Sequence, residues 1–146
     1  MYKLKTRIDF EAAHRLYNVN TYSEECSDNL HGHSYKVDVV VGRETLNNAD
    51  MVIDFKLLKE RLRKCIVDKF DHSCILCIDD PLAKYVNKYC KKVHIVPESP
   101  TAEYMAADFA DRISSELIKI DPEVVVLSVS VHETENNIAT WEESDR

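Results

Sequence analysis

The sequence predicts an α+β domain in which helices pack on one face of a mainly antiparallel sheet. Two segments near the start alternate between apolar and polar residues, which is typical of half-buried strands. Farther along, apolar residues recur every three or four positions after residues that commonly start helices, which is typical of amphipathic helices. Two short apolar runs complete the expected order β-β-α-α-β-α-β.

Length and charge narrow the class of protein. The 146 residues fit a single domain over residues 1–146, without an internal repeat or linker. A chain of this length buries roughly two-thirds of its unfolded surface, so it needs no disulfides to fold. The net charge of −7 and the lack of a Lys/Arg-rich run argue against nucleic acid or a membrane as a partner.

Cysteine usage and the start of the chain indicate a location. Five cysteines form an odd count without a disulfide framework, which fits a reducing compartment. Charged residues alternate through the first ten positions, where a signal peptide would be apolar. The longest strongly apolar run, Val124–Leu127, is too short to cross a bilayer. We therefore expect a cytoplasmic protein.

Two strands are expected on either side of a polar loop. The first covers residues 3–14, and one of its sides carries Leu4, Thr6, Ile8, Phe10, Ala12 and His14. Residues 15–30 are polar and irregular and predict a loop. The second strand covers residues 33–42 and begins with His33. If the two strands pair antiparallel across the loop, their histidine-bearing ends lie together.

Three helices and two more strands follow. Asp54 is expected to cap the first helix, Asp80-Pro81 to start the second, and Ser99-Pro100 to cap and start the third. The strands are expected over residues 93–96 and 124–133. The inward-facing residues should be Phe55, Leu58, Leu62, Cys65, Ile66 and Lys69 in the first helix, Leu82, Tyr85, Val86 and Tyr89 in the second, Met105, Phe109, Ile113 and Leu117 in the third, and Leu127, Val129, Val131 and Glu133 in the last strand.

Three histidines predict a metal site. His31 and His33 flank one glycine in an extended segment, so both imidazoles point to the same side. His14 converges on them if the first two strands pair. A single histidine is usually solvated or satisfied in the core, but three imidazoles with an open fourth position are the ligands of a catalytic zinc. Intrinsic affinity would favour copper, whereas availability and an all-imidazole tetrahedral site favour zinc.

Other residues carry possible chemistry. Cys26 lies in the polar loop near the histidines, where a cationic neighbourhood would make it a functional thiol. Asp71-His72 ends a helix, where His is common, but beside a thiol the pair could transfer protons. Glu133 is either a solvated strand end or a carboxylate that binds a guanidine-like ring edge through two hydrogen bonds. Cys74-x-x-Cys77 lacks a partner motif and is expected to be core.

Six sequence blocks resemble the 6-pyruvoyltetrahydropterin synthase / 6-carboxytetrahydropterin synthase family. In order, they are Phe10–His14, Cys26 with His31–Tyr35, Met51–Phe55, Phe70–His72, Pro100–Glu103 and Glu133-Thr134. The resemblance implies the tunnelling fold (T-fold), in which subunits form rings that close a β-barrel, usually as a hexamer of two trimers. It also implies active sites at the subunit interfaces.

The resemblance further implies the roles of individual residues. His14, His31 and His33 would bind Zn²⁺, and Cys26 would be the proton-abstracting thiolate. Asp71 and His72 would form a proton relay, and Glu133 with Thr134 would bind the pterin. The implied reaction is that of 6-carboxytetrahydropterin synthase, which converts 7,8-dihydroneopterin triphosphate to 6-carboxy-5,6,7,8-tetrahydropterin. It releases acetaldehyde and triphosphate on the route to queuosine-type deazapurines.

Departures from the family pattern leave alternatives open. Four residues separate Cys26 from His31, whereas the carboxy branch commonly has three and the pyruvoyl branch five. Asp28 or Glu25 could therefore act as the base instead. Residues 133–137 are similar to the pyruvoyl branch. The alternatives are a synthase that forms 6-pyruvoyltetrahydropterin or 6-hydroxymethyldihydropterin from the same substrate, and a non-catalytic relative that binds pterin and zinc.

Overall fold

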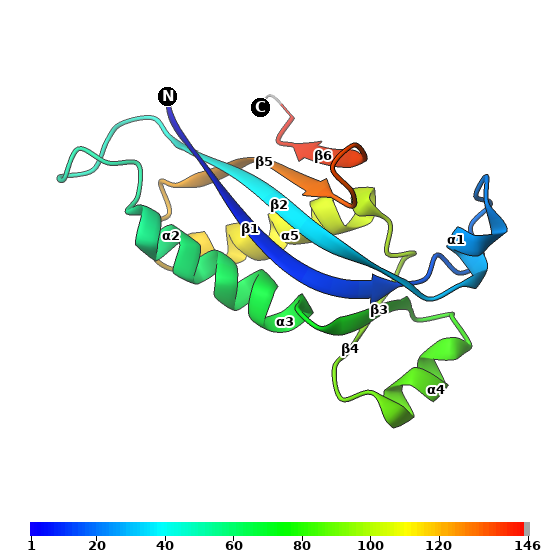
Figure 1. The fold of residues 1–146 in the computed structure, drawn as a ribbon. Coiled ribbons are helices and arrows are strands. Elements are labelled where there is room, and N and C mark those ends of the chain that lie inside the picture. Colours follow the sequence, from blue (N-terminus) through cyan, green and yellow to red (C-terminus); the bar gives the residue numbers. More distant parts are fainter. Residues whose placement is uncertain (145–146) are drawn as a thin grey trace.

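The structure is a computed structural model that describes residues 1–144. Its framework is a curved six-stranded sheet with strand order β4-β3-β1-β2-β5-β6, and the long helices lie on one side of it (Figure 1). The strands are β1 (Tyr2–His14), β2 (His31–Arg43), β3 (Ser73–Cys77), β4 (Val93–Val96), β5 (Val125–His132) and β6 (Ile138–Glu142). The helical segments are α1 (Glu24–Asp28), α2 (Phe55–Leu62), the π-helical segment η1 (Arg63–Val67), α3 (Asp68–Phe70), α4 (Leu82–Tyr89) and α5 (Ala102–Leu117). The predicted α+β class is confirmed.

The pairing of β1 with β2 determines the geometry of the site. The strands are antiparallel, and their register runs from Tyr2 opposite Arg43 to His14 opposite His31. Burial alternates along β1, so the predicted apolar side faces the core and the charged side faces away from it. Ala12 lies opposite His33. The predicted convergence of the two strand ends is therefore confirmed.

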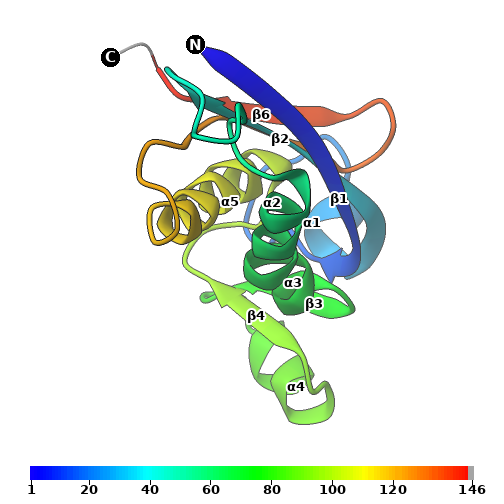
Figure 2. The same ribbon diagram turned by 90° about the vertical axis from the view of Figure 1, so that its left-hand side faces the viewer.

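An aromatic cluster fills the core beneath this end of the sheet. The ring centroid of Phe10 lies 5.1 Å from that of Tyr35, 6.0 Å from that of Phe70 and 5.9 Å from that of Phe109. The predicted inward side of α5 is fully buried, and Figure 2 shows α5 beside α2 and α3 on the same face of the sheet. Close packing of large rings holds the ends of β1 and β2 in place.

Two strands and one helix were not predicted. β3 pairs parallel with β1 and with β4, whereas the pairs β1–β2, β2–β5 and β5–β6 are antiparallel. The sheet is therefore mainly antiparallel, as expected. β6 adds an edge strand after β5. The expected loop over residues 15–30 contains α1. These elements are only five residues long, which is too short for a clear periodic pattern.

Helix boundaries follow the capping groups. The Asp54 carboxylate accepts the backbone N–H groups of Lys56 and Leu57, which confirms it as an N-cap. The third helix instead begins after Thr101, whose hydroxyl accepts the Tyr104 N–H. The prediction of Ser99 as its cap is therefore wrong.

Several residues predicted to face inward are exposed. Phe55 and Lys69 at the ends of the α2–α3 segment, and Tyr85 and Tyr89 on α4, point to solvent. Only Val86 of α4 is buried, because α4 lies beside β3 and β4 at the edge of the sheet and packs against little else (Figure 1). A helix at an edge buries a narrower stripe than a helix that crosses the sheet.

A β-bulge changes the inward face of β5. The ladder passes from Val40 opposite Ser128 to Val41 opposite Val126, which leaves Leu127 as the extra residue. Val126 is therefore buried, whereas Leu127 packs over Gly42 on the other face. A Cβ atom at Gly42 would lie 2.6 Å from Cδ1 of Leu127, so any larger residue would require the Leu127 side chain to shift. The prediction that Leu127 shares the core face is wrong.

The CxxC pair on β3 is split between the two faces of the sheet. Cys77 is buried as predicted, but Cys74 is only part-buried. All five cysteines are free thiols. None of the helices in residues 1–144 is long and apolar enough to cross a membrane.

Candidate metal centre and active site

The three histidines form a compact cluster where β1 ends and β2 begins. His14, His31 and His33 each offer one ring nitrogen, and these atoms lie within 4.8 Å of one another. The Nε2 atoms of His14 and His31 are 3.0 Å apart. Zinc–nitrogen bonds of about 2.0–2.1 Å in a tetrahedron place the ligand nitrogens about 3.3 Å apart. The cluster therefore has the dimensions of a three-imidazole metal site.

Backbone carbonyls orient two of the rings. Nδ1–H of His14 donates to the Pro100 carbonyl at 2.8 Å, and Nδ1–H of His31 donates to the Asn29 carbonyl at 2.9 Å. In each ring, this leaves the lone pair of Nε2 directed at the centre of the cluster. Sequence reasoning missed both carbonyls, because a backbone group leaves no signature in the pattern of side chains.

The residues fit a bound cation. Two Nε2 lone pairs that face each other at 3.0 Å repel unless a proton or a cation lies between them. His33 Nε2 is buried and has no hydrogen-bond partner among residues 1–144. Burial lowers the pKa of His14 to about 4, despite the Pro100 carbonyl, so this ring is neutral and able to bind a metal at neutral pH. One metal ion would satisfy all three nitrogens.

Glu133 stands at the rim of the histidine cluster. Its carboxylate oxygens lie 3.6 Å from His33 Nε2 and 4.0 Å from His14 Nε2. The neighbouring Thr134 is exposed, and its hydroxyl accepts backbone N–H groups within the turn that follows, at Asn136 and Asn137. The structure thus brings Glu133 to the histidines, whereas the Thr134 hydroxyl shapes the turn that carries Glu133.

Cys26 lies on α1, close in the fold to the end of β1. Its carbonyl accepts the N–H of Leu16, two residues after His14. Its side chain is part-buried. The four residues that separate it from His31 include Asn29, which caps α1 with its N–H and orients His31 with its carbonyl. The unusual spacing therefore corresponds to an ordered helical connection.

The two alternative carboxylates differ in their surroundings. Glu25 is exposed and accepts the Ser23 hydroxyl, and this hydrogen bond lowers its pKa, which makes it a weaker base. Asp28 is exposed at the end of α1, and Ser27 approaches it at 3.4 Å. Of the two carboxylates, Asp28 is the freer one.

Asp71 and His72 form the hydrogen-bonded pair that a proton relay needs. Asp71 accepts the Glu11 backbone N–H and the Nδ1–H of His72, both at 2.9 Å. Both bonds lower the pKa of Asp71, and the bond from the Glu11 backbone N–H has the larger effect. His72 has a left-handed backbone with φ of 58°, uncommon for a residue with a side chain, and its N–H donates to the Glu11 carbonyl at 2.6 Å. Its imidazole is 80% exposed.

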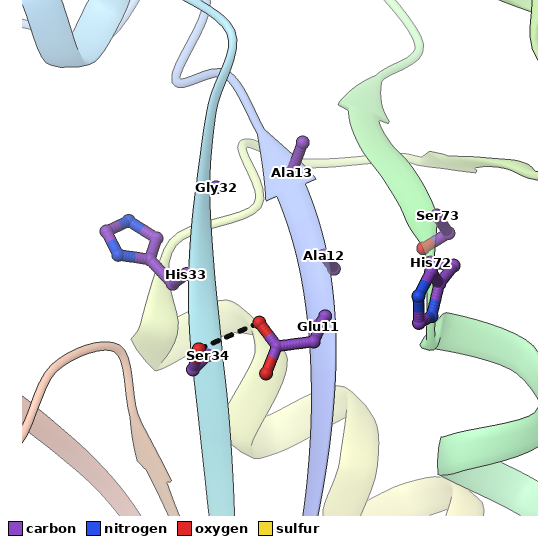
Figure 3. A pocket seen from close by; sticks show the side chains of 8 residues that line it. All are labelled: Glu11, Ala12, Ala13, Gly32, His33, Ser34, His72 and Ser73. Atoms are coloured by element: carbon purple, nitrogen blue, oxygen red, sulfur yellow. Dashed lines mark hydrogen bonds between the residues drawn. The ribbon is translucent and has the colours of Figure 1, made fainter.

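The pair does not join the histidine cluster of its own chain. The Glu11 side chain alternates to the face of β1 opposite His14 and hydrogen-bonds Ser34 there. A hollow of about 360 Å³ lies at this place, and both His33 and His72 contribute to its lining. Figure 3 shows the His33 ring directed away from His72, with both strands between them. Within one chain, the imidazoles of His33 and His72 therefore point in different directions.

Comparisons with known proteins agree with the resemblance. The family described as 6-pyruvoyl tetrahydropterin synthase matches residues 3–144. A 6-carboxy-5,6,7,8-tetrahydropterin synthase from Aquifex aeolicus is 37% identical over 153 positions, which cover 92% of this chain and 93% of that protein. A protein of the same name from Rickettsia typhi is 35% identical over 138 positions, which cover 93% and 96%.

A solved structure agrees as well. The 6-pyruvoyl tetrahydropterin synthase of Caenorhabditis elegans superposes with a TM-score of 0.70 at 26% identity, and the match covers 98% of this chain and 96% of that one. The curled sheet with helices on one face is thus the predicted T-fold.

We expect the purified chain to bind about one divalent transition-metal ion, because three imidazoles converge on one point. His33→Ala removes one of the three ligands, so elemental analysis after dialysis should find much less metal. His72→Ala removes an exposed imidazole outside the cluster and should leave the metal content unchanged. Equal metal content in the wild type and the His33 variant would contradict the assignment.

Proposed function

This chain belongs to the 6-pyruvoyl tetrahydropterin synthase family, and from that premise we propose that it is a 6-carboxy-5,6,7,8-tetrahydropterin synthase. The reaction consumes 7,8-dihydroneopterin triphosphate and water and yields 6-carboxy-5,6,7,8-tetrahydropterin, acetaldehyde and triphosphate. The observation that carries the proposal is the three-histidine cluster with a carboxylate at its rim, in a chain whose curated relatives have this name.

The ion we propose is zinc. Three imidazoles with an open fourth position suit catalytic zinc, and the carbonyl bonds to His14 and His31 are the supporting contacts such ligands commonly have. Zinc bound there would act as a Lewis acid toward the side-chain oxygens of the substrate and make the adjacent C–H bonds more acidic.

The protein side chains would do the remaining chemistry. Glu133 accepts the two N–H groups on the guanidine-like edge of the pterin, which positions the side chain of the substrate at the histidine cluster. Cys26 removes a proton as a thiolate, and His72 returns a proton at a different atom. Asp71 holds the His72 ring in one tautomer through its hydrogen bond to Nδ1.

We further propose that the active site is completed by a second copy of the chain. His72 lies away from the cluster of its own chain, so it would serve the cluster of a neighbour. The sheet also ends in two edge strands, β4 and β6, whose free backbone groups are available for pairing between subunits. Both features suit a ring-shaped homo-oligomer, a hexamer built as a dimer of trimers.

The runner-up product is 6-pyruvoyltetrahydropterin. The sequence of residues 133–137 is similar to the pyruvoyl branch, and the four residues between Cys26 and His31 lie between the usual spacings of the two branches. The same starting compound, the same metal cluster and the same pterin anchor would serve both reactions. The product itself therefore decides between them.

Incubation of the zinc-loaded protein with 7,8-dihydroneopterin triphosphate should give acetaldehyde and 6-carboxytetrahydropterin, because the reaction cleaves the side chain of the pterin. Mass spectrometry with a carbonyl-trapping reagent measures both products. The His33→Ala protein is the control and should give neither. Formation of 6-pyruvoyltetrahydropterin would support the runner-up, and absence of any product would refute both assignments and favour a non-catalytic binding protein.

Cys26→Ala should lower turnover by about 10²–10⁴-fold, because it removes the base, while the metal content stays unchanged. Asp28→Ala, a substitution on the same short helix, should keep most of the activity. Steady-state kinetics of both variants measure the effect. Full activity in Cys26→Ala together with a large loss in Asp28→Ala would move the role of base to the carboxylate.

Mixing two inactive variants should restore activity if His72 acts on a neighbouring chain. His33→Ala keeps a working relay and His72→Ala keeps a working metal cluster, so random co-assembly by co-expression should recover roughly a quarter of wild-type activity. Co-expression of His31→Ala with His33→Ala is the control and should recover none, because both substitutions damage the same cluster. No recovery in the first mixture would contradict a shared site.

A further inference from the structure

Tyr35 has a buried hydroxyl that the core does not use. The residue is completely buried, and its hydroxyl has no hydrogen-bond partner among residues 1–144. Buried hydroxyl groups are nearly always paired, since an unpaired one loses its bonds to water and gains nothing in return. A phenylalanine would fill the same space without this penalty. The hydroxyl therefore requires an explanation other than packing.

The position of Tyr35 is beside the metal cluster. It follows His33 by two residues on β2, so both side chains point to the same face of the sheet. Its ring centroid lies 5.4 Å from that of His33 and 6.0 Å from that of His14. On the core side, the ring stacks on Phe10 at 5.1 Å with an interplanar angle of 20°. This stacking fixes the direction of the phenol.

Glu133 is the cross-strand neighbour of Tyr35. The last ladder pair between β2 and β5 is Lys36 with His132, so the next opposed positions are Tyr35 and Glu133. A tyrosine hydroxyl is protonated at neutral pH and can donate a hydrogen bond. Continuing the register thus places an O–H donor and a carboxylate acceptor at opposed positions of neighbouring chain segments.

Metal binding changes the partners available to Glu133. In the described structure, its oxygens lean toward Nε2 of His33 and Nε2 of His14. His14 donates through Nδ1, so its Nε2 already has a lone pair and no N–H. Once His33 Nε2 also directs its lone pair at a cation, neither imidazole has an N–H on that side to offer the carboxylate. The Tyr35 hydroxyl, at the opposed position, is a buried donor without a hydrogen-bond partner among residues 1–144.

We propose that Tyr35 is a positioning residue whose O–H donates to the Glu133 carboxylate in the metal-loaded, pterin-bound site. The bond would hold the carboxylate in the orientation that receives the two N–H groups of the pterin. A carboxylate has enough lone pairs for all three hydrogen bonds. This inference rests on the proposed function, because it assumes that Glu133 binds a pterin.

The test is Tyr35→Phe, which removes one oxygen atom and keeps the ring. The zinc content should stay the same, and the melting temperature should stay equal or rise, because an unpaired buried hydroxyl is lost. The dissociation constant for 7,8-dihydroneopterin, a probe without the triphosphate, should rise about tenfold on the zinc-loaded protein, as should KM, with little change in kcat. Tyr85→Phe, the same change at an exposed position on α4, is the control and should alter none of these quantities.

A double-mutant cycle with Glu133→Gln completes the test. If Tyr35 acts through Glu133, adding Tyr35→Phe to Glu133→Gln should weaken pterin binding no further. Additive losses, unchanged pterin binding in Tyr35→Phe, or a lower melting temperature with normal binding would each overturn the inference. The binding measurement needs no turnover. A wild-type protein that binds 7,8-dihydroneopterin but does not convert 7,8-dihydroneopterin triphosphate would refute the proposed activity, and the role of Tyr35 could still be tested by binding.

Discussion

The site depends on one constraint, the register between β1 and β2. His14 opposite His31 and Ala12 opposite His33 place three imidazoles on one face at one end of the sheet. A slip of one residue would turn every side chain of one strand to the other face and separate the ligands. The register is held along 13 paired positions and by the buried alternation of both strands, so the metal geometry follows from the packing of the whole hairpin.

The same constraint separates the two parts of the proposed chemistry. The even-numbered residues of β1 from Thr6 to His14 face the core. On the other side of the strand, the backbone N–H and carbonyl of Glu11 hydrogen-bond Asp71 and His72. One strand thus carries His14 of the candidate metal cluster on one face and anchors the hydrogen-bonded pair Asp71 and His72 beside the other. The exposed imidazole of His72 is therefore available to a neighbouring chain, as the proposed oligomer requires.

Much of this arrangement could be predicted from the sequence, and the failures have physical causes. The alternation of apolar and polar residues predicted β1, β2 and the meeting of their ends. Asp54 was correctly predicted as a helix N-cap from its residue type and position. β3 was missed because its five residues are buried on both sides and show no period. The parallel pairing of β3 with β1 determines the face on which His72 lies. It joins segments that are far apart in the sequence, so no local pattern predicts it. The bulge at Leu127 is equally non-local, since it arises from the match between two strands.

The carbonyl of Pro100 joins the largest helix to the chemistry. It receives His14 just before α5 begins, and α5 is anchored in the core by Met105, Phe109, Ile113 and Leu117. By linkage, a ligand that binds better when His14 is correctly held also favours the docked position of that helix, and the reverse is equally true. A cation bound at the histidine cluster would therefore also stabilise the packing of α5 in the hydrophobic core, although it does not touch that helix.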